Sequence, residues 1–370
     1  MNKNKVLILG GYGNFGKRIA TALAKDGIAI IIAGRDEEKA KNLHSLLQEK
    51  YPNSNIEIAI FDAAKNLSSQ LEKLAAAVVI NTAGPFQNAN YDIAKTCINH
   101  GINYIDLADG RDFVREISTL DDAAKKSGSL VISGASTVPA LSSAVLEKYK
   151  NRFDKIDKMI FGVSPGQKAS RGLATTKGIL SYIGKPLKSH AGVDKTRYGW
   201  QDLYCITYPA NLGNRLMANC DIPDLDLLPK RYNIGSIRFS AGMESFALHL
   251  GIWLTSWLVR LGLLINLEKH AKLLLKTSFL FDFLGTDAGG MHVILKGTKN
   301  GLKKEVRWFI IAKNGDGPQI PTIPAIILAK KIIRGQIAQS GALPCVAMVS
   351  LEEYLAELKE FAVSTYEEIY

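Results

Sequence analysis

The feature that most constrains the fold is the stretch LILGGYGNFGKRIA at residues 7–20, where a short apolar run stops at glycine and a helix-patterned segment follows. Gly11, Gly13 and Gly16 match the pattern G-x-G-x-x-G. The first glycine permits a tight turn, the second lets the backbone approach a pyrophosphate, and the third lets helix and strand pack closely. Amides from Asn14 onward then face an anion at the start of the helix. The sequence therefore predicts a dinucleotide-binding turn.

Apolar runs of strand length alternate with helical segments up to about Ser133. These runs are Val6–Leu9, Ile28–Ala33, Ile56–Phe61, Val78–Ile80, Tyr104–Leu107 and Leu130–Ile132. Strands separated by helices form a parallel sheet with right-handed crossovers. The chain is therefore expected to be an α/β protein whose N-terminal part is a Rossmann domain, a doubly wound parallel sheet.

The pattern changes after about Leu146. Longer runs suited to strands occupy Lys158–Val163 and Ile234–Ala241, and Asn300-Gly301 between Met291–Leu295 and Glu305–Ala312 predicts a hairpin. The tail has a helical pattern over Pro324–Arg334 and Leu351–Val363. We predict an NAD(P)-binding domain over residues 1–145, an inserted mixed α/β domain for substrate or oligomerisation over 146–320, and C-terminal helices over 321–370 that return to the first domain.

The end of the second strand bears on the choice of dinucleotide. An NAD site places an acid there for the ribose hydroxyls, but this chain reads IIIAGRDEEKA. Gly34 leaves room for a 2′-phosphate, and Arg35 can bind it through a bidentate contact. Asp36 is better explained as the cap of the next helix, with Glu37 and Glu38 in the first turn. The sequence favours NADP over NAD.

Two further strand ends should border the same dinucleotide. Asp62 and Ala63 follow the third strand, where adenine lies in this fold, and residues 81–87 (NTAGPFQ) follow the fourth, beside the nicotinamide ribose. After the fifth strand, Asp109 is a candidate acid or base and Arg111 a candidate clamp for a substrate carboxylate. The alternative is that Asp109 and Asp112 begin a helix and that Arg111 is solvated.

Composition narrows the class of protein. The net charge of +11 is spread along the chain without a recognition motif, so a nucleic-acid partner is not expected. The four cysteines and six histidines show no metal-binding spacing, and no metal site is expected. Reduced thiols and an N-terminus that does not read as a signal peptide favour a cytoplasmic protein.

Three stretches, GGYGNFG, NTAGPFQNANYDIAKTCINHGINYIDLADGRDFV and SGASTVPALSSAV, resemble the saccharopine dehydrogenase (saccharopine reductase) superfamily. Later segments, GTDAGGMHVILKG, GDGPQIPTIPA and GALPC, resemble its less characterised members. The resemblance implies a substrate bound between a Rossmann domain and an inserted α/β domain. It also implies a set of residues that border the cofactor: Gly11, Tyr12, Gly13, Asn14, Phe15, Arg35, Thr82, Ala83, Gly84 and Pro85.

The chemistry of the family forms or breaks a C–N bond of an amino acid. Saccharopine enzymes carry Asp-Pro-Gly after the sixth strand, where this chain has SGASTVPALSS, so we expect it not to oxidise saccharopine efficiently. We expect an NADP-dependent oxidoreductase acting on a small-molecule substrate. The alternatives are a reductase for a lipid-like substrate at a membrane surface and a non-catalytic NADP-binding redox sensor.

Residues 248–284 are unusually apolar for a soluble domain. Apolar side chains recur at helical spacing from Leu250 to Ile265, and Lys269, Lys272 and Lys276 follow among leucines and phenylalanines. His249 and Arg260 interrupt the stretch, so it does not read as a membrane span. We expect a helical pair that packs on the second domain and contributes to a homodimer interface. Peripheral membrane contact is the alternative.

Overall fold

The computed structural model describes residues 4–264 and 266–370 and divides the chain into two domains. The first domain comprises Met1–Leu141 and Gln319–Val349, and the second comprises Ser142–Pro318 and Ser350–Tyr370. The predicted boundaries were at residues 145 and 320, and residues 350–370, which were expected in the first domain, lie in the second. Ile265, part of the predicted apolar stripe, lies outside the described residues.

The first domain is built on a parallel sheet in the order β13-β6-β5-β4-β1-β2-β3. Its strands are β1 (Lys5–Leu9), β2 (Ile30–Gly34), β3 (Ile56–Ile60), β4 (Ala76–Asn81), β5 (Asn103–Asp106), β6 (Leu130–Ser133) and β13 (Gly341–Pro344). The strand order reverses between β1 and β4, and ligands of such sheets bind at the carboxyl ends beside that point. The predicted Rossmann architecture is confirmed.

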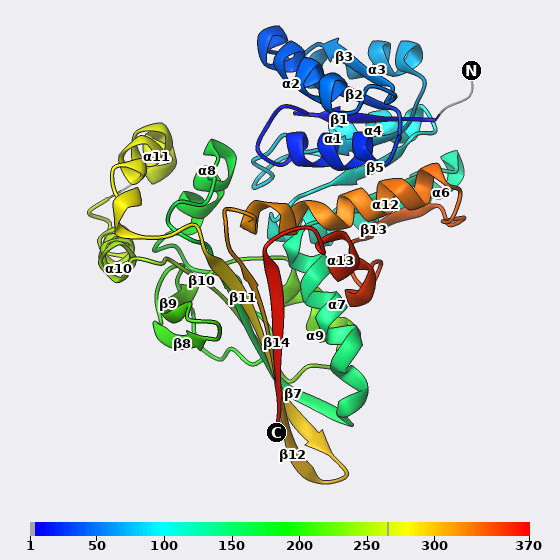
Figure 1. Cartoon of the computed structure of the whole chain (residues 1–370). Coiled ribbons are helices and arrows are strands. Elements are labelled where there is room, and N and C mark those ends of the chain that lie inside the picture. The colour runs from blue at the N-terminus through cyan, green and yellow to red at the C-terminus, as the bar shows by residue number, and fades with distance from the viewer. Residues whose placement is uncertain (1–3, 265) are drawn as a thin grey trace. The chain divides into compact units, whose positions relative to one another are not determined.

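Helices cover both faces of this sheet. They are α1 (Gly16–Lys25), α2 (Glu37–Lys50), α3 (Ala63–Leu74), α4 (Asp92–Asn99), α5 (Arg111–Arg115), α6 (Asp121–Ser127) and α12 (Ile323–Ile333). Side chains of α3, α4 and α6 share a core with the sheet through Leu71, Cys97 and Ala124. Helix α12 lies beside α1 and packs against β4 and β5 (Figure 1). The segment 319–349 therefore completes the first domain after residues 142–318 of the second domain have intervened.

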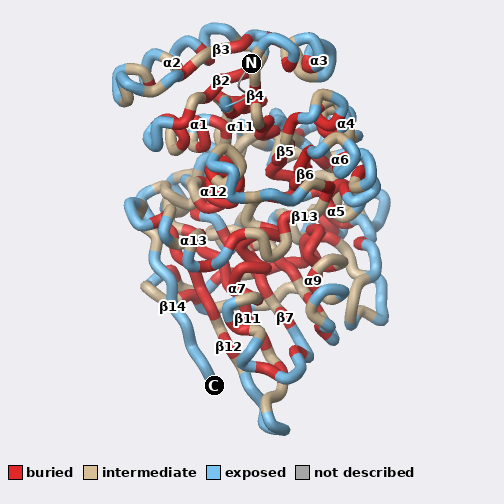
Figure 2. The backbone as a smooth tube through the Cα atoms, turned by 90° about the vertical axis from the view of Figure 1, so that its right-hand side faces the viewer, coloured by how far each residue is buried: buried red, intermediate tan, exposed pale blue. Residues whose placement is uncertain are grey.

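The second domain is built on a mixed sheet in the order β14-β12-β11-β7-β10-β9-β8. Its strands are β7 (Lys155–Ser164), β8 (Tyr204–Tyr208), β9 (Gly213–Asn219), β10 (Ser236–Gly242), β11 (Gly289–Lys299), β12 (Leu302–Ala312) and β14 (Val363–Ile369). The predicted hairpin is confirmed: β11 and β12 pair along their whole length, and Asn300 and Gly301 both have positive φ. Strand β14 is an exposed edge strand next to β12 (Figure 2).

Helices of the second domain lie in two groups. They are α7 (Ser142–Tyr149), α8 (Leu173–Tyr182), α9 (Asp224–Tyr232), α10 (Phe246–Arg260), α11 (Ala271–Phe279) and α13 (Leu351–Glu357). Figure 1 shows α7, α9 and α13 on one side of the strands and α8, α10 and α11 on the other. Among the described residues, no helix combines the length and the apolar content needed to cross a membrane.

One prediction about the tail was wrong. The helix expected over Leu351–Val363 ends at Glu357, and Val363–Ile369 form strand β14. Every residue of β14 pairs with a residue of β12 in antiparallel register. The open edge of β12 supplies a ladder of main-chain hydrogen bonds, which outweighs the weak local preference of so short a segment.

Candidate functional site

The glycine turn connects β1 to α1 in the geometry that the sequence predicts. Gly10 has a φ of +73°, and its carbonyl accepts a hydrogen bond from the Gly13 amide at 2.8 Å. A Cβ at Gly16 would overlap the carbonyl oxygen of Gly10 and lie 2.8 Å from Gly11 Cα. The third glycine is therefore required because the first turn of α1 packs directly on the turn backbone.

Free amides point from this turn toward the start of α1. Within the described part of the chain, the amides of Tyr12, Phe15 and Gly16 donate to no main-chain acceptor. The guanidinium of Arg18 holds Asn14, with Nη1 2.6 Å from Asn14 Oδ1. Unpaired amides at a helix N-terminus, together with a nearby cation, make a site for a phosphate or pyrophosphate.

The ring of Tyr12 covers the end of β2. A Cβ at Gly34 would lie only 2.5 Å from the Tyr12 hydroxyl oxygen, so the space that Gly34 leaves is filled by this ring rather than kept open. The Tyr12 hydroxyl accepts a hydrogen bond from the Asp36 amide at 2.8 Å. Tyr12 therefore fixes the glycine turn to the segment that follows β2.

Arg35 and Asp36 have different roles at this strand end. Asp36 caps α2 by accepting from the Lys39 amide at 3.1 Å, as predicted, and its hydrogen bond to the Lys39 side chain lowers the pKa of its carboxyl. Arg35 is exposed and forms no ion pair with any residue that the structure describes. A free guanidinium one residue beyond the strand remains available to a 2′-phosphate.

The third and fourth strands contribute loops to the same edge of the sheet. Asp62 caps α3 through the Ala64 amide at 3.1 Å, so Asp62 and Ala63 lie at the carboxyl end of β3. Thr82 donates to the carbonyl of Leu9 at 2.8 Å, which braces the loop after β4 against the start of the glycine turn.

The remainder of the loop after β4 is also fixed by hydrogen bonds. The Asn81 side chain accepts from the Ala83 amide at 3.0 Å and donates to the Tyr104 hydroxyl at 3.2 Å. The peptide between Gly84 and Pro85 is cis. Strand β4, which ends at Asn81, is the neighbour of β1 in the sheet. The loop formed by Thr82, Ala83, Gly84 and Pro85 therefore begins beside the glycine turn.

Asp106 is the buried acid of this region. Its Oδ1 accepts from the Gly134 amide at 2.8 Å, the Ser133 hydroxyl at 2.9 Å and the Ala108 amide at 3.0 Å. Burial raises the pKa of Asp106 to about 6, and these hydrogen bonds oppose that rise. Because the side chain is fully buried, Asp106 cannot touch a substrate. It is a positioning residue that fixes the loop after β5 to the end of β6.

The two predicted catalytic candidates lie just beyond Asp106. Asp109 is exposed and accepts a hydrogen bond from Gln87 Nε2 at 3.0 Å. Desolvation by the surrounding protein raises the pKa of Asp109, and the Gln87 hydrogen bond opposes this rise. Arg111 is buried, so the alternative that it is solvated is wrong, and little of its surface is left for a substrate. The helix there begins at Arg111 after Gly110, rather than at Asp109.

Comparison with known proteins agrees with this geometry. Residues 6–132 match the family described as saccharopine dehydrogenase NADP binding domain. This match covers about a third of the chain and supports a saccharopine dehydrogenase-like NADP-binding domain. The matched part contains the glycine turn, the loops after β2 to β5 and Asp106, and it supports an NADP-dependent oxidoreductase.

Similar full-length proteins match only in part. A "Lipid droplet localized protein" of Caenorhabditis elegans is 24% identical over 149 residues, which is 38% of this chain and 35% of that protein. A "Putative steroid dehydrogenase 3" of the same organism is 33% identical over 85 residues, 21% of this chain and 27% of that protein. The chain thus spans about a third or less of the length of these curated relatives.

A solved structure also matches in part. A short-chain dehydrogenase from Sphingobium yanoikuyae in complex with NADPH is 16% identical, with a TM-score of 0.29 over 35% of this chain and 70% of that chain.

The NADP-binding domain does not hold the only buried polar groups. In the second domain, His292 on β11 is fully buried between two tyrosines of β8, with Nδ1 2.8 Å from the Tyr208 hydroxyl and Nε2 3.1 Å from the Tyr204 hydroxyl. Strands β9, β10 and β7 separate β8 from β11 in the sheet, so the sheet must curl for these side chains to meet. Burial lowers the pKa of His292 to about 3, so its ring is neutral.

A second polar cluster surrounds Glu244. Its carboxyl accepts from the amides of Gln167 at 2.8 Å and Thr286 at 2.7 Å, and it lies 3.3 Å from Arg215. Burial acts to raise the pKa of Glu244, but these hydrogen bonds outweigh it and the pKa is lowered. Neither cluster was predicted from the sequence. The available signal for the first was a lone histidine in the otherwise apolar start of β11 and two tyrosines on one face of β8.

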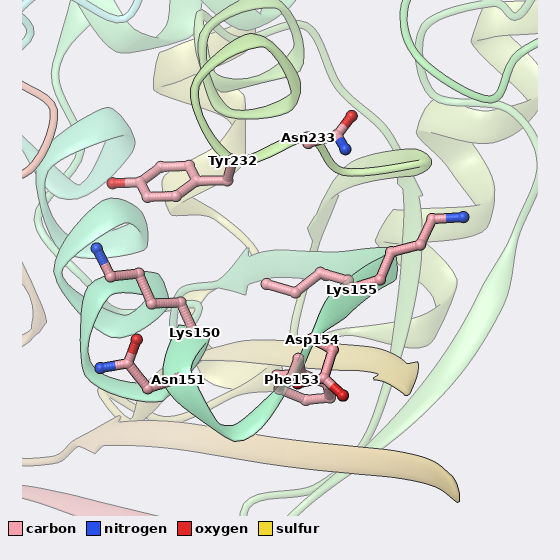
Figure 3. Close-up of a pocket in the computed structure, with 8 residues that line it drawn as sticks. Lys150, Asn151, Phe153, Asp154, Lys155, Tyr232 and Asn233 are labelled. Carbon is pink, nitrogen blue, oxygen red and sulfur yellow. The ribbon is translucent and has the colours of Figure 1, made fainter. Parts of the chain in front are cut away.

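The rest of the described structure offers no comparable site. The second domain has a pocket of about 220 Å³. It is lined by Lys150, Asn151, Phe153, Asp154, Lys155, Ile156, Tyr232 and Asn233 (Figure 3). It is smaller than ordinary ligand sites and has no glycine turn or buried acid. Among the residues that the structure describes, no group of three or more His, Cys, Asp or Glu side chains is placed to hold a metal ion.

Proposed function

We propose that this protein is an NADP-dependent oxidoreductase. The proposal rests on two observations together: amides at the start of α1 have no main-chain acceptor, and Arg35 just beyond the end of β2 has no ion-pair partner among the described residues. The amides of Tyr12, Phe15 and Gly16 would bind the pyrophosphate, and Arg35 the 2′-phosphate. NADP, when bound, supplies or accepts the hydride.

The remaining residues orient the cofactor and substrate. Asp62 and Ala63 would border adenine, and Thr82, Ala83, Gly84 and Pro85 the nicotinamide ribose. Asp109 would exchange a proton with the reacting group of the substrate, because it is the exposed carboxyl nearest in sequence to the fixed loop after β5. Asp106 would hold that loop in place. Binding of the substrate between the two domains stays a prediction from the family resemblance.

A second candidate differs in the substrate. The protein would reduce a lipid-like molecule at a membrane surface. The names of the two Caenorhabditis elegans relatives support this version, and so do the exposed apolar side chains of residues 246–283 in the second domain.

Titration of NADP and NAD tests the cofactor assignment. Arg35→Ala should weaken NADP binding by at least tenfold and leave NAD binding unchanged, because only NADP carries the 2′-phosphate. The matched control is Arg334→Ala, also an exposed arginine of the first domain. Arg334 lies one turn after Lys330. Lys330 pairs with Asp26, which follows the C-terminal end of α1, whereas the glycine turn precedes the N-terminal end of α1. Arg334 is therefore at the opposite edge of the sheet from the glycine turn.

Three outcomes separate the alternatives. Equal losses for both dinucleotides in Arg35→Ala would show that Arg35 has a structural role. Loss in the Arg334→Ala control would show a general effect of charge. Tight NADP binding without NADPH consumption across carbonyl and imine substrates would favour the redox sensor over the enzyme.

A further inference from the structure

Helix α10 exposes its apolar face. Leu254, Trp257, Leu258 and Leu261 recur at steps of three and four residues, so they share one side of the helix and its end. Their exposed fractions are 56%, 37%, 40% and 67%. A stripe of this spacing on a soluble domain ordinarily faces the core.

The opposite side of α10 carries the polar residues. His249 and Ser256 are fully buried. His249 Nδ1 accepts from the Met243 amide at 3.2 Å, and its ring packs against Trp200. Burial lowers the pKa of His249 to about 4, so the buried ring is neutral. Helix α10 therefore packs through the side that carries His249, Ser256 and the partly buried Ile252, and the exposed leucines cannot turn inward without exposing His249.

Helix α11 and the segment that follows it extend the same kind of surface. Leu273, Leu280 and Phe283 have exposed fractions of 60%, 71% and 76%. The helix packs beside α8 (Figure 1), where Arg171 pairs with Asp282 and stacks 4.5 Å from the centre of the Phe279 ring. Arg171 thus joins the segment before α8 to the segment that follows α11. We call residues 246–283 the α10–α11 surface.

The charge of this surface is one-sided. Lys269, Lys272 and Lys276 are exposed and have no ion-pair partner among the described residues. The acids of the same segment are engaged elsewhere: Glu268 faces Lys185 at 3.7 Å, and Asp282 pairs with Arg171. The α10–α11 surface therefore combines large apolar side chains with uncompensated positive charge.

We propose that the α10–α11 surface docks on an anionic lipid surface. The apolar side chains would enter the boundary between headgroups and acyl chains, and the three lysines would contact anionic headgroups. A second copy of this chain fits less well, because a two-fold contact would bring these lysines together without free acids to face them. This docking would hold whether or not the first domain turns over NADP.

Vesicle flotation of the full chain tests the proposal. The probes are phosphatidylcholine vesicles with and without phosphatidylserine. We expect flotation with the anionic vesicles, little with the neutral ones, and loss of binding at high salt. Of the four tryptophans, Trp200 and Trp308 are buried, whereas Trp253 and Trp257 are partly exposed on α10. A blue shift of tryptophan emission on vesicle binding would therefore report insertion of α10.

Paired variants separate the apolar and charged contributions. Leu261→Ser with Leu280→Ser should weaken vesicle binding at least tenfold, whereas Leu302→Ser, on an equally exposed leucine at the β11–β12 turn, should not. Lys272→Gln with Lys276→Gln should weaken it roughly 25-fold, at about fivefold for each lysine. The control pair Lys303→Gln with Lys304→Gln removes the same charge from exposed lysines outside the surface.

Light scattering and NADP titration complete the test. A stable dimer that does not bind vesicles would overturn the proposal in favour of a second copy of this chain. A monomer that does not bind vesicles would also overturn it. Equal binding to neutral and anionic vesicles would overturn the role of the lysines. NADP binding, measured on the same samples, reports the proposed function separately, so either test can fail while the other succeeds.

Discussion

Helices α1 and α10 both carry apolar side chains at helical spacing, but α1 buries these side chains in the core and α10 exposes them on the surface. Helix α1 buries Ile19 and Leu23 and exposes Lys17 and Lys25. Helix α10 buries His249 and Ser256 and exposes a row of leucines and Trp257. Periodicity thus shows that a helix has an apolar face, whereas the neighbours available to the helix decide whether that face turns inward.

The largest expected difference between the two helices is in the cost of a polar substitution. Leu23→Ser should lower the free energy of unfolding by about 4 kcal/mol, because it leaves a cavity and a hydroxyl in the core. Leu254→Ser, the same change on α10, should alter it by less than about 0.5 kcal/mol in the protein free of partners. Urea unfolding of both variants measures this difference. A large loss in Leu254→Ser would show that its face is covered within the molecule.

A pH titration of stability tests the buried acid of the first domain. The pKa of Asp106 is about 6 in the folded protein, above its unfolded value near 4. The folded state therefore binds the proton more tightly, and stability should fall by about 2 kcal/mol as the pH rises from 4 to 7. Asp106→Asn, which keeps an oxygen for the three donors, should lose this part of the pH dependence.

Asp122→Asn is the control for Asp106→Asn, because Asp122 is an exposed acid of the same domain. Its pH profile should match that of the unaltered protein. An unchanged profile in Asp106→Asn would mean that Asp106 titrates in the folded protein much as it does in the unfolded chain.

The smallest expected effects come from adding one methyl group to each helix. Gly16→Ala should destabilise the protein by about 1 to 3 kcal/mol and weaken NADP binding, because the new Cβ meets the turn backbone. Gly251→Ala on α10 should stabilise it by up to about 1 kcal/mol, since no atom lies within 4 Å and alanine is the better helix former. Thermal unfolding of the two variants measures the loss of stability expected for Gly16→Ala and the gain expected for Gly251→Ala, and NADP titration measures the change in binding. A stabilised Gly16→Ala variant would contradict the close approach of α1 to the turn.

The first domain was predictable from sequence because its signals are local. The apolar runs, the glycine turn and the cap at Asp36 each follow from residues within one turn or strand. The short strand β13 and the edge strand β14 were not predicted, since both form by pairing with strands distant in sequence. Burial of Asp106 rather than Asp109 was equally inaccessible, because it depends on contacts with β6. The roles of the predicted cofactor-binding residues remain predictions.

The interrupted chain of the first domain has a consequence for its synthesis on the ribosome. Residues 1–141 emerge first, but α12 and β13 follow only after about 180 further residues, an interval of roughly 10 to 35 seconds at ordinary elongation rates. During that time the face of β4 and β5 lacks its helix, and the edge of β6 lacks its neighbour. The nascent chain therefore presents an open sheet edge, and we expect the first domain to be prone to aggregation until residues 319–349 emerge.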